Sequence, residues 1–107
     1  MISVIYYRGH NRLTVEGHAH SDEYGKDLIC AAASALAITL ATNVNIMANQ
    51  GYVANPVTNL GDGSAEISCN PRTRYRDSVK QVFMSVCVGF EVLSKQYPEY
   101  ISYCVRG

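Results

Sequence analysis

The most constraining feature of the chain is a long stretch without charge. No Asp, Glu, Lys or Arg occurs from Leu28 to Gly61, a run of 34 positions. Its first part, from Leu28 to about Asn49, is rich in Ala, Leu and Ile and predicts a helix. A helix that is apolar nearly all round is buried on more than one side. We therefore expect either a central helix or a helix covered by a second copy of the chain.

The composition limits which classes of protein are possible. With 107 residues the chain forms one domain, and its nine basic and nine acidic residues give no net charge. This removes the general electrostatic argument for a nucleic-acid or acidic-membrane binder, so neither partner is expected. The N-terminus has no signal-sequence pattern, and the least polar run, Leu28 to Ala41, is shorter than the ~20 residues that span a bilayer. We expect a soluble cytoplasmic protein whose four cysteines are free thiols.

The hydrophobic pattern predicts an alternation of strands and helices. Five segments read as strands, at residues 2–7, 12–17, 52–59, 64–70 and 100–105. Helices are predicted at 28–49 and 74–96. Pro56 places its strand at a sheet edge or gives it an irregular start, and Gly89 indicates close packing of the second helix. The predicted fold is a single α+β domain, residues 1–107, in the order ββαββαβ, with two helices packed on a mainly antiparallel sheet.

The segment GHAHSDEYGKDLICAAAS, residues 17–34, carries the side chains suited to chemistry. His18 ends a strand and Cys30 opens a helix twelve residues later, so the loop between them can bring both side chains to one point. A thiol nucleophile needs a lowered pKa and an imidazole beside it. Asp27 is a natural N-cap and places Cys30 in the first helical turn. There the unpaired N–H groups favour a thiolate and can hold an oxyanion.

Each of these residues also has a purely structural interpretation. Cys30 can be a small buried apolar residue, and His18 can be structural or merely exposed at a strand end. Asp27 can cap the helix, orient the imidazole as a third catalytic member, or do both. Ser34 lies one turn after Cys30 on the same face, where its hydroxyl either bonds back to the preceding turn or lines the site.

A zinc site is an alternative of another class. His18, His20 and Cys30 offer the nitrogen and sulfur donors that tetrahedral zinc accepts. The fourth ligand would come from Asp22, Asp27, His10 or water. Zinc signatures carry tighter paired spacings, so the Cys–His interpretation is preferred and neither a metal nor another cofactor is expected.

A basic cluster supplies a non-catalytic alternative. Arg72, Arg74 and Arg76, interleaved with Tyr75, are suited to contact phosphate or RNA. The chain would then be a dimeric binding module associated with the ribosome or with RNA. The competing interpretation is a solvated helix start, partly neutralised by Asp77.

The string GHA…GKDLICAAASAL resembles the ribosomal-processing cysteine proteases of Firmicutes and their relatives, the Prp family. The family pattern is close to GHA, a loop containing Gly, and then D-[IL]-[IV]-C-A-A-x-S. The matching residues are Gly17, His18, Ala19, Gly25, Asp27, Cys30, Ala31, Ala32 and Ser34, with the His-to-Cys spacing preserved. The tail from Gly89 to Ile101 also resembles the end of the family.

The resemblance implies a cytoplasmic homodimer and a cysteine endopeptidase that needs no cofactor. The family removes a short hydrophobic N-terminal extension, after its aromatic end, from the precursor of a large-subunit ribosomal protein. Related enzymes process phage structural proteins, which is the alternative substrate class. By motif match, Cys30 is the nucleophile and His18 the base, with Asp27 and Ser34 in support.

The resemblance also implies a mobile lid over the substrate, formed by the loop from Ala19 to Lys26. Ala19, His20 and Gly25 are its candidate residues. His20 departs from the family pattern, which usually has Gly there. A bulkier residue stiffens the loop and adds a titratable group beside the site, which puts the substrate preference in question and keeps the zinc alternative open.

Overall fold

The computed structural model describes residues 1–18 and 24–107, with the backbone alone for 24–27. The main elements are β1 (Ile2–Tyr7), β2 (Arg12–Glu16), α1 (Tyr24–Asn49), β3 (Val53–Gly61), β4 (Ser64–Pro71), α2 (Arg76–Gln96) and β5 (Ile101–Arg106). Two short 3₁₀ turns, η1 (Arg8–His10) and η2 (Thr73–Tyr75), follow β1 and precede α2. The order ββαββαβ confirms the predicted α+β fold.

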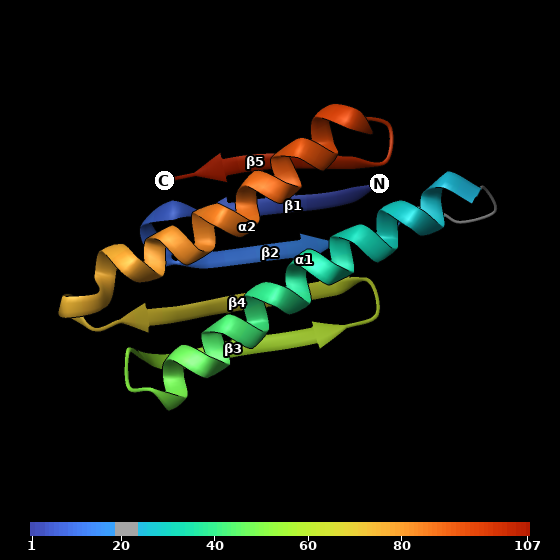
Figure 1. Ribbon diagram of the computed structural model, residues 1–107. Coiled ribbons are helices and arrows are strands. Elements are labelled where there is room, and N and C mark those ends of the chain that lie inside the picture. Colours follow the sequence, from blue (N-terminus) through green and yellow to red (C-terminus); the bar gives the residue numbers. More distant parts are fainter. Residues whose placement is uncertain (19–23) are drawn as a thin grey trace.

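The strands form one five-stranded sheet in the order β3-β4-β2-β1-β5 (Figure 1). Three of its four pairings are antiparallel, and β1 with β5 is parallel. The chain reaches β5 through α2, which crosses the sheet so that β5 starts beside the start of β1. The sheet is therefore mainly antiparallel, as predicted from the sequence.

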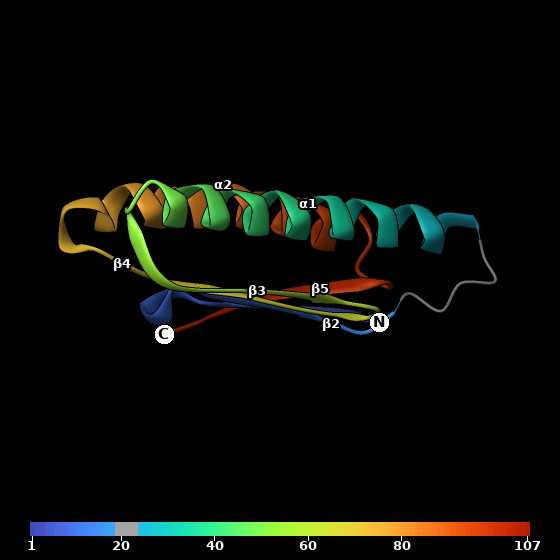
Figure 2. The ribbon, with the colours of Figure 1, turned by 90° about the horizontal axis from the view of Figure 1, so that it is seen from below.

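The two helices lie side by side on one face of the sheet and leave the other face uncovered (Figure 2). The core between the layers is formed by fully buried side chains from the sheet and from both helices, among them Leu13, Ile67, Leu40, Phe83 and Phe90. The uncovered face is polar, and Arg12 and Glu66 form an ion pair of 2.7 Å across it. This alternation of apolar and polar residues is what a sheet covered on one side requires.

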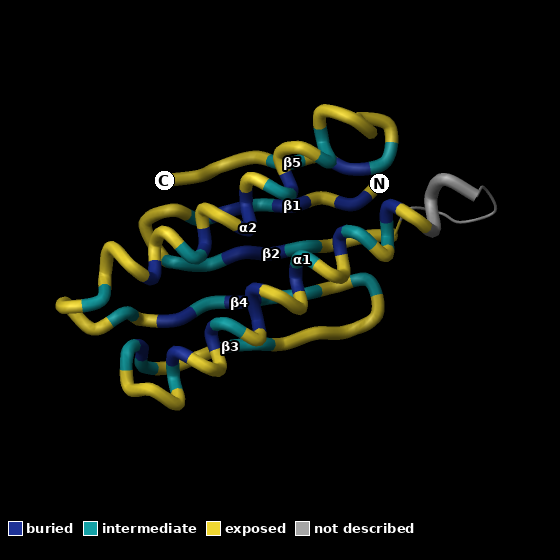
Figure 3. The backbone as a smooth tube through the Cα atoms, viewed as in Figure 1, coloured by how far each residue is buried: buried dark blue, intermediate teal, exposed yellow. Residues whose placement is uncertain are grey.

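Helix α1 is the apolar helix that the charge-free stretch predicts, but its outward side is exposed, so within this chain it is not the central helix expected as one of the two alternatives. The stretch Leu28–Asn49 has a mean hydropathy of 1.6 and is long and apolar enough to cross a membrane. Ruling out a span by the shortness of Leu28 to Ala41 was therefore wrong. One side of α1 packs against the sheet and is buried from Ile29 to Met47 (Figure 3). A helix packed in this way in a domain core has the same length and composition as a membrane span. The buried residues include Ala33, Ala37, Leu40, Ala41, Val44 and Met47.

Pro56 lies in β3, which is an edge strand, and the pairing of β3 with β4 shifts register between Ala54 and Val57. Both features confirm the expectation drawn from this proline, since a residue without an N–H is tolerated at an edge or bulge. Asn55 takes a left-handed φ of 52° within the bulge. Pro56 lies between the paired residues Ala54 and Val57, so its missing N–H removes no hydrogen bond from the β3–β4 ladder.

Gly89 marks the contact between the two helices. A Cβ placed on Gly89 would lie 2.8 Å from Cδ2 of Leu36 in α1. The absence of a side chain lets the helices approach each other here, which confirms the close packing expected from this residue.

Candidate functional site

The register of the sheet places the end of β2 beside the turn between β3 and β4. Glu16, the last residue of β2, pairs with Ser64, the first of β4. The backbone N–H of Gly17 then donates to the carbonyl oxygen of Gly63 at 2.9 Å. His18, the next residue, therefore lies against the β3–β4 turn, although 45 positions separate it from Gly63 in the sequence.

The backbone around His18 is also held by the start of the chain. The α-amino group of Met1 donates to the carbonyl oxygen of His18 at 2.9 Å. Gly17 has a left-handed φ of 102°, and a Cβ there would run into the carbonyl group of Met1. Glycine is required here by both conformation and space. This accounts structurally for the glycine that precedes His18 in the motif.

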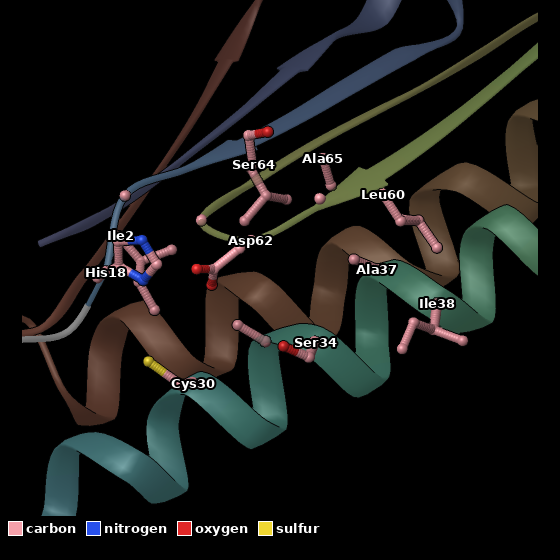
Figure 4. Close-up of a pocket in the computed structure, with 15 residues that line it drawn as sticks. Ile2, His18, Cys30, Ser34, Ala37, Ile38, Leu60, Asp62, Ser64 and Ala65 are labelled. Carbon is pink, nitrogen blue, oxygen red and sulfur yellow. The ribbon is translucent and has the colours of Figure 1, made fainter. Parts of the chain in front are cut away.

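A cavity of about 240 Å³ lies between α1 and this end of the sheet (Figure 4). His18 lines it from the strand side, while Cys30 and Ser34 line it from α1. Cys30 is half-buried, and its sulfur points toward the space beside His18. The structure thus brings together His18, Cys30 and Ser34, three of the residues selected from the sequence.

The two ends of the cavity differ in polarity. Near His18 and Cys30 the wall contains Asp62, Gly63 and Ser64 of the β3–β4 turn. The other end is apolar and is lined by Ala37, Ile38, Leu60 and Ala65. Ile38 and Leu60 are each about half exposed, at 51% and 48%, so this apolar end opens to the surface. An extended peptide with an apolar side chain would match this arrangement.

None of the four cysteines is in a disulfide, as expected, but they have different surroundings. Burial raises the pKa of Cys69 to about 11 and also raises the pKa of Cys87, so both thiols stay protonated at neutral pH. Cys104 is exposed on β5, at the other edge of the sheet from β3. Of the four, Cys30 is the thiol that lines the cavity.

A half-buried thiol and an imidazole at one cavity are the parts of a cysteine hydrolase site. The sequence matches the profile of the family described as cysteine protease Prp over residues 1–102.

The chain belongs to the cysteine protease Prp family. It is therefore a peptide-bond hydrolase, as the motif predicts.

Solved structures agree with this assignment. The essential ribosomal processing protease Prp of S. aureus, in complex with a covalently linked product peptide, is 25% identical with a TM-score of 0.74, and the match covers 99% of this chain and 100% of that one. SMU.848 of Streptococcus mutans is 27% identical with a TM-score of 0.69, covering 98% and 91%. The S. aureus protease with a substrate peptide, at 21% identity and a TM-score of 0.70 over 98% and 97%, adds evidence for the fold. No curated protein matches the chain.

The start of α1 corrects one expectation about this Prp-family site. The helix begins at Tyr24, so Asp27 is its fourth residue and not its N-cap, and Cys30 is its seventh. Cys30 therefore lies in the second turn, beyond the unpaired N–H groups of the first four residues. The oxyanion site assigned to those groups is not supported at Cys30. Capping residue types also occur at Ser21 and Asp22, so residue type alone did not fix the boundary.

The expected lid and zinc site fall largely outside the described residues. Ala19, His20 and Asp22 belong to the segment 19–23. Gly25 was expected in the loop but lies in the first turn of α1.

His10 belongs to η1, at the other end of β2 from His18, so it is too far away to share a metal with it (Figure 1). Within residues 1–18 and 24–107, no group of three potential metal ligands is present.

The basic cluster holds the fold together at the end opposite the cavity. Arg72 donates from Nε to the carbonyl oxygen of Gly51 at 2.9 Å, and the guanidinium of Arg74 lies 5.7 Å from the ring centre of Tyr75. Tyr75 stacks on Tyr52 at 4.2 Å. Arg72 and the Tyr75–Tyr52 stack thus tie the segment before α2 to the turn after α1, and Arg74 contacts the ring of its neighbour Tyr75. These intramolecular contacts favour the structural interpretation.

Sequence reasoning missed the contribution of Asp62 and Gly63 to the site. It placed residues 60–63 only as the connection between the strands predicted at 52–59 and 64–70. The signal that would have found them is the order of strands in the sheet, because β4 next to β2 brings this turn to His18. Local sequence patterns do not contain that pairing.

Proposed function

We propose that this Prp-family protease cleaves peptide bonds with a Cys30–His18 dyad. The observation that carries the proposal is the shared cavity, which His18 and Cys30 line from opposite sides. The other three thiols are buried or lie elsewhere on the molecule. Cys30 is therefore the thiol placed to meet both an imidazole and a substrate.

The chemistry follows from these two groups. His18 takes the thiol proton of Cys30 and gives a thiolate–imidazolium pair. The sulfur attacks the peptide carbonyl carbon, the C–N bond breaks, and His18 returns its proton to the leaving amine. Water, deprotonated by the same imidazole, attacks the thioester and releases the acid and the Cys30 thiol. No metal or organic cofactor takes part in this sequence.

Ser34 and Asp27 support the dyad in this proposal. Ser34 lines the cavity one helical turn after Cys30, within reach of a substrate bound over the thiol. Asp27 lies one turn before Cys30 on the same helix. The lid function assigned to Ala19, His20 and Gly25 rests on the sequence resemblance.

The proposed substrate is the precursor of a large-subunit ribosomal protein, cleaved after the aromatic end of its hydrophobic N-terminal extension. The S. aureus relative supports this, since it is a ribosomal processing protease that holds a covalently linked product peptide. The apolar end of the cavity supports it too, because Ile38 and Leu60 offer an open apolar surface to such an extension.

The proposed assembly is a cytoplasmic homodimer formed through the helix layer. The outward side of α1 carries Leu28, Ala31, Ala35, Thr39, Thr42 and Ile46 and contains no charged side chain from Leu28 onward. On α2, Val88 and Val92 are exposed at 60% and 46%. Exposed apolar residues spread over two adjacent helices suit contact with a second copy.

The test is intact-mass analysis of the precursor after incubation with the protein. The wild type is expected to remove one segment, ending at the aromatic end of the extension. Cys30→Ala and His18→Ala are expected to leave the precursor intact, while the matched control Cys104→Ala cleaves normally. Cleavage by Cys30→Ala would overturn the dyad. An untouched precursor with the wild type would reject this substrate, and phage structural proteins would be the next class to assay.

A further inference from the structure

The β3–β4 turn lines the cavity and also contacts the side chain of His18. A Cβ placed on Gly63 would lie 2.7 Å from Cε1 and 3.0 Å from Cδ2 of His18, and closer still to Nε2. The imidazole ring therefore rests directly on the backbone of Gly63. Gly63 also has a left-handed φ of 74°, which glycine adopts without strain. The turn thus fixes both the backbone before His18, through the Gly17–Gly63 hydrogen bond, and the position of its ring.

Asp62 precedes Gly63 in this turn and lines the same cavity. Figure 4 shows its carboxylate directed from the turn toward the His18 ring, while the sulfur of Cys30 approaches the same space from α1. Among the described residues, the ionisable groups that line the cavity or bond to His18 are Asp62, Cys30 and the α-amino group of Met1. Asp62 is the carboxylate of this set.

A carboxylate beside an imidazole has a defined effect on a Cys–His pair. It orients the ring through its N–H and stabilises the imidazolium that forms when the thiol gives up its proton. Asp27 was the sequence candidate for this third role. The pairing of β2 with β4 places Asp62 beside His18, and Asp62 lines the cavity.

We propose that Asp62 positions the His18 imidazole, with Gly63 as the surface on which the ring rests. Asp62 acts through His18 and is a positioning residue, not a group that touches the scissile bond. This proposal rests on the Cys30–His18 dyad proposed above.

Asp62→Asn tests the proposal because it keeps the size of the side chain and removes its charge. We expect kcat to fall about tenfold, which corresponds to about 1.4 kcal/mol of activation free energy, while KM changes less than twofold. Loss of the carboxylate also disfavours the imidazolium, so the alkaline limb of the kcat/KM profile is expected at lower pH than in the wild type. Asp62→Glu, which restores the charge, is expected to regain the wild-type limb.

The matched control is Asp77→Asn, the same change at the start of α2 at the opposite end of the molecule. It is expected to leave kcat and the pH profile unchanged. Thermal unfolding of both variants separates a loss of function from a loss of fold. An Asp62→Asn enzyme with wild-type kcat and an unmoved alkaline limb would overturn the proposal.

Alkylation of Cys30 by iodoacetamide at pH 6, followed by peptide mapping, distinguishes this proposal from the dyad itself. The dyad predicts that wild-type Cys30 reacts faster than the exposed Cys104, and that His18→Ala removes the difference. Asp62 acting through His18 predicts slower reaction of Cys30 in Asp62→Asn, with no further slowing when Asp62→Asn is added to His18→Ala. Equal rates for Cys30 and Cys104 in the wild type would reject the dyad. If Cys30 reacts faster than Cys104 and its rate is the same in Asp62→Asn as in the wild type, the positioning role is rejected and the dyad is retained.

Discussion

At the scale of single residues, the surroundings of a side chain decide what its chemical type can do. Cys30 and Cys69 are the same residue, but Cys30 lines an open cavity and Cys69 is 1% exposed in the core. The sequence identified Cys30 through its motif and its distance from His18. It did not identify Asp62, because an Asp-Gly pair in a hairpin turn is typical of turns in general. Only the pairing of β2 with β4 gives that Asp a neighbour to act on.

Buried thiols make the stability of the fold depend on alkaline pH. The pKa of Cys69 is raised from its usual 9 to about 11 by burial. Between these values the unfolded chain loses the proton while the folded chain keeps it. The contribution of this thiol to the free energy of unfolding is therefore fully present below pH 9. It falls as the pH rises from 9 toward 11, by up to about 1.4 kcal/mol per pH unit.

Urea unfolding at pH 8, 9 and 10 measures this effect. Cys69→Ala is expected to be less stable than the wild type at pH 8, because it leaves a cavity, and to lose stability less steeply above pH 9. Parallel curves for the two proteins would show that the Cys69 thiol does not contribute.

Gly89 makes a second residue-scale prediction. Gly89→Ile inserts a branched side chain where Leu36 of α1 already lies, and we expect a loss of about 1–3 kcal/mol in the free energy of unfolding. Gly89→Ala is the matched control. Its single methyl meets only the flexible tip of Leu36 and gains up to about 1 kcal/mol of helix propensity, so its effect is expected to be smaller. Equal Tm values for the isoleucine variant and the wild type would contradict the close packing of the two helices.

At the scale of elements, local patterns predicted type and order well and boundaries less well. Alternating residues, helical spacing and Pro56 gave the five strands, the two helices and the edge position of β3. The start of α1 was misplaced by four residues, because several residues before Leu28 suit a cap and the helix continues through Gly25. Helix propensity differences of about 1 kcal/mol at a single glycine do not stop a helix whose buried side continues for many turns.

The bulge in β3 predicts how the edge strand responds to mutation. Asn55 has a φ of 52°, a conformation that costs a residue with a branched Cβ about 1–2 kcal/mol. Asn55→Val is expected to lower the free energy of unfolding by that amount, and Asn55→Gly to leave it nearly unchanged. Asn59→Val, in the regular part of the same strand opposite Glu66, is the control and is expected to be neutral or stabilising. Equal losses at Asn55 and Asn59 would contradict a strained bulge.

At the scale of the whole molecule, the chain is a two-layer domain with one polar and one largely apolar outer face. The uncovered sheet face carries the Arg12–Glu66 ion pair, while the outward side of α1 carries no charge from Leu28 onward. The sequence predicted the charge-free helix but not the order of the strands. That order depends on which strands pair over long separations, and local periodicity does not encode it.

The proposed homodimer gives a prediction at this scale. Light scattering is expected to show twice the 11.8 kDa chain mass for the wild type. Ala35→Glu places a charge on the outward side of α1 and is expected to give monomers. Ala35→Gln introduces a side chain of nearly the same size as Glu but without the charge, and it is expected to stay dimeric. Ser102→Glu, on the exposed surface of β5, controls for added charge elsewhere. A wild type that runs as a monomer at all concentrations would contradict the proposed assembly.

The central claim is that Cys30 attacks a peptide bound in the cavity shared with His18. The most direct measurement is covalent labelling with a peptidyl fluoromethyl ketone that ends in phenylalanine, followed by peptide mapping of all four cysteines. The account predicts one added label, on Cys30, and loss of that label in His18→Ala. A label on Cys104, or an unlabelled Cys30 in a protein that still cleaves its substrate, would contradict it.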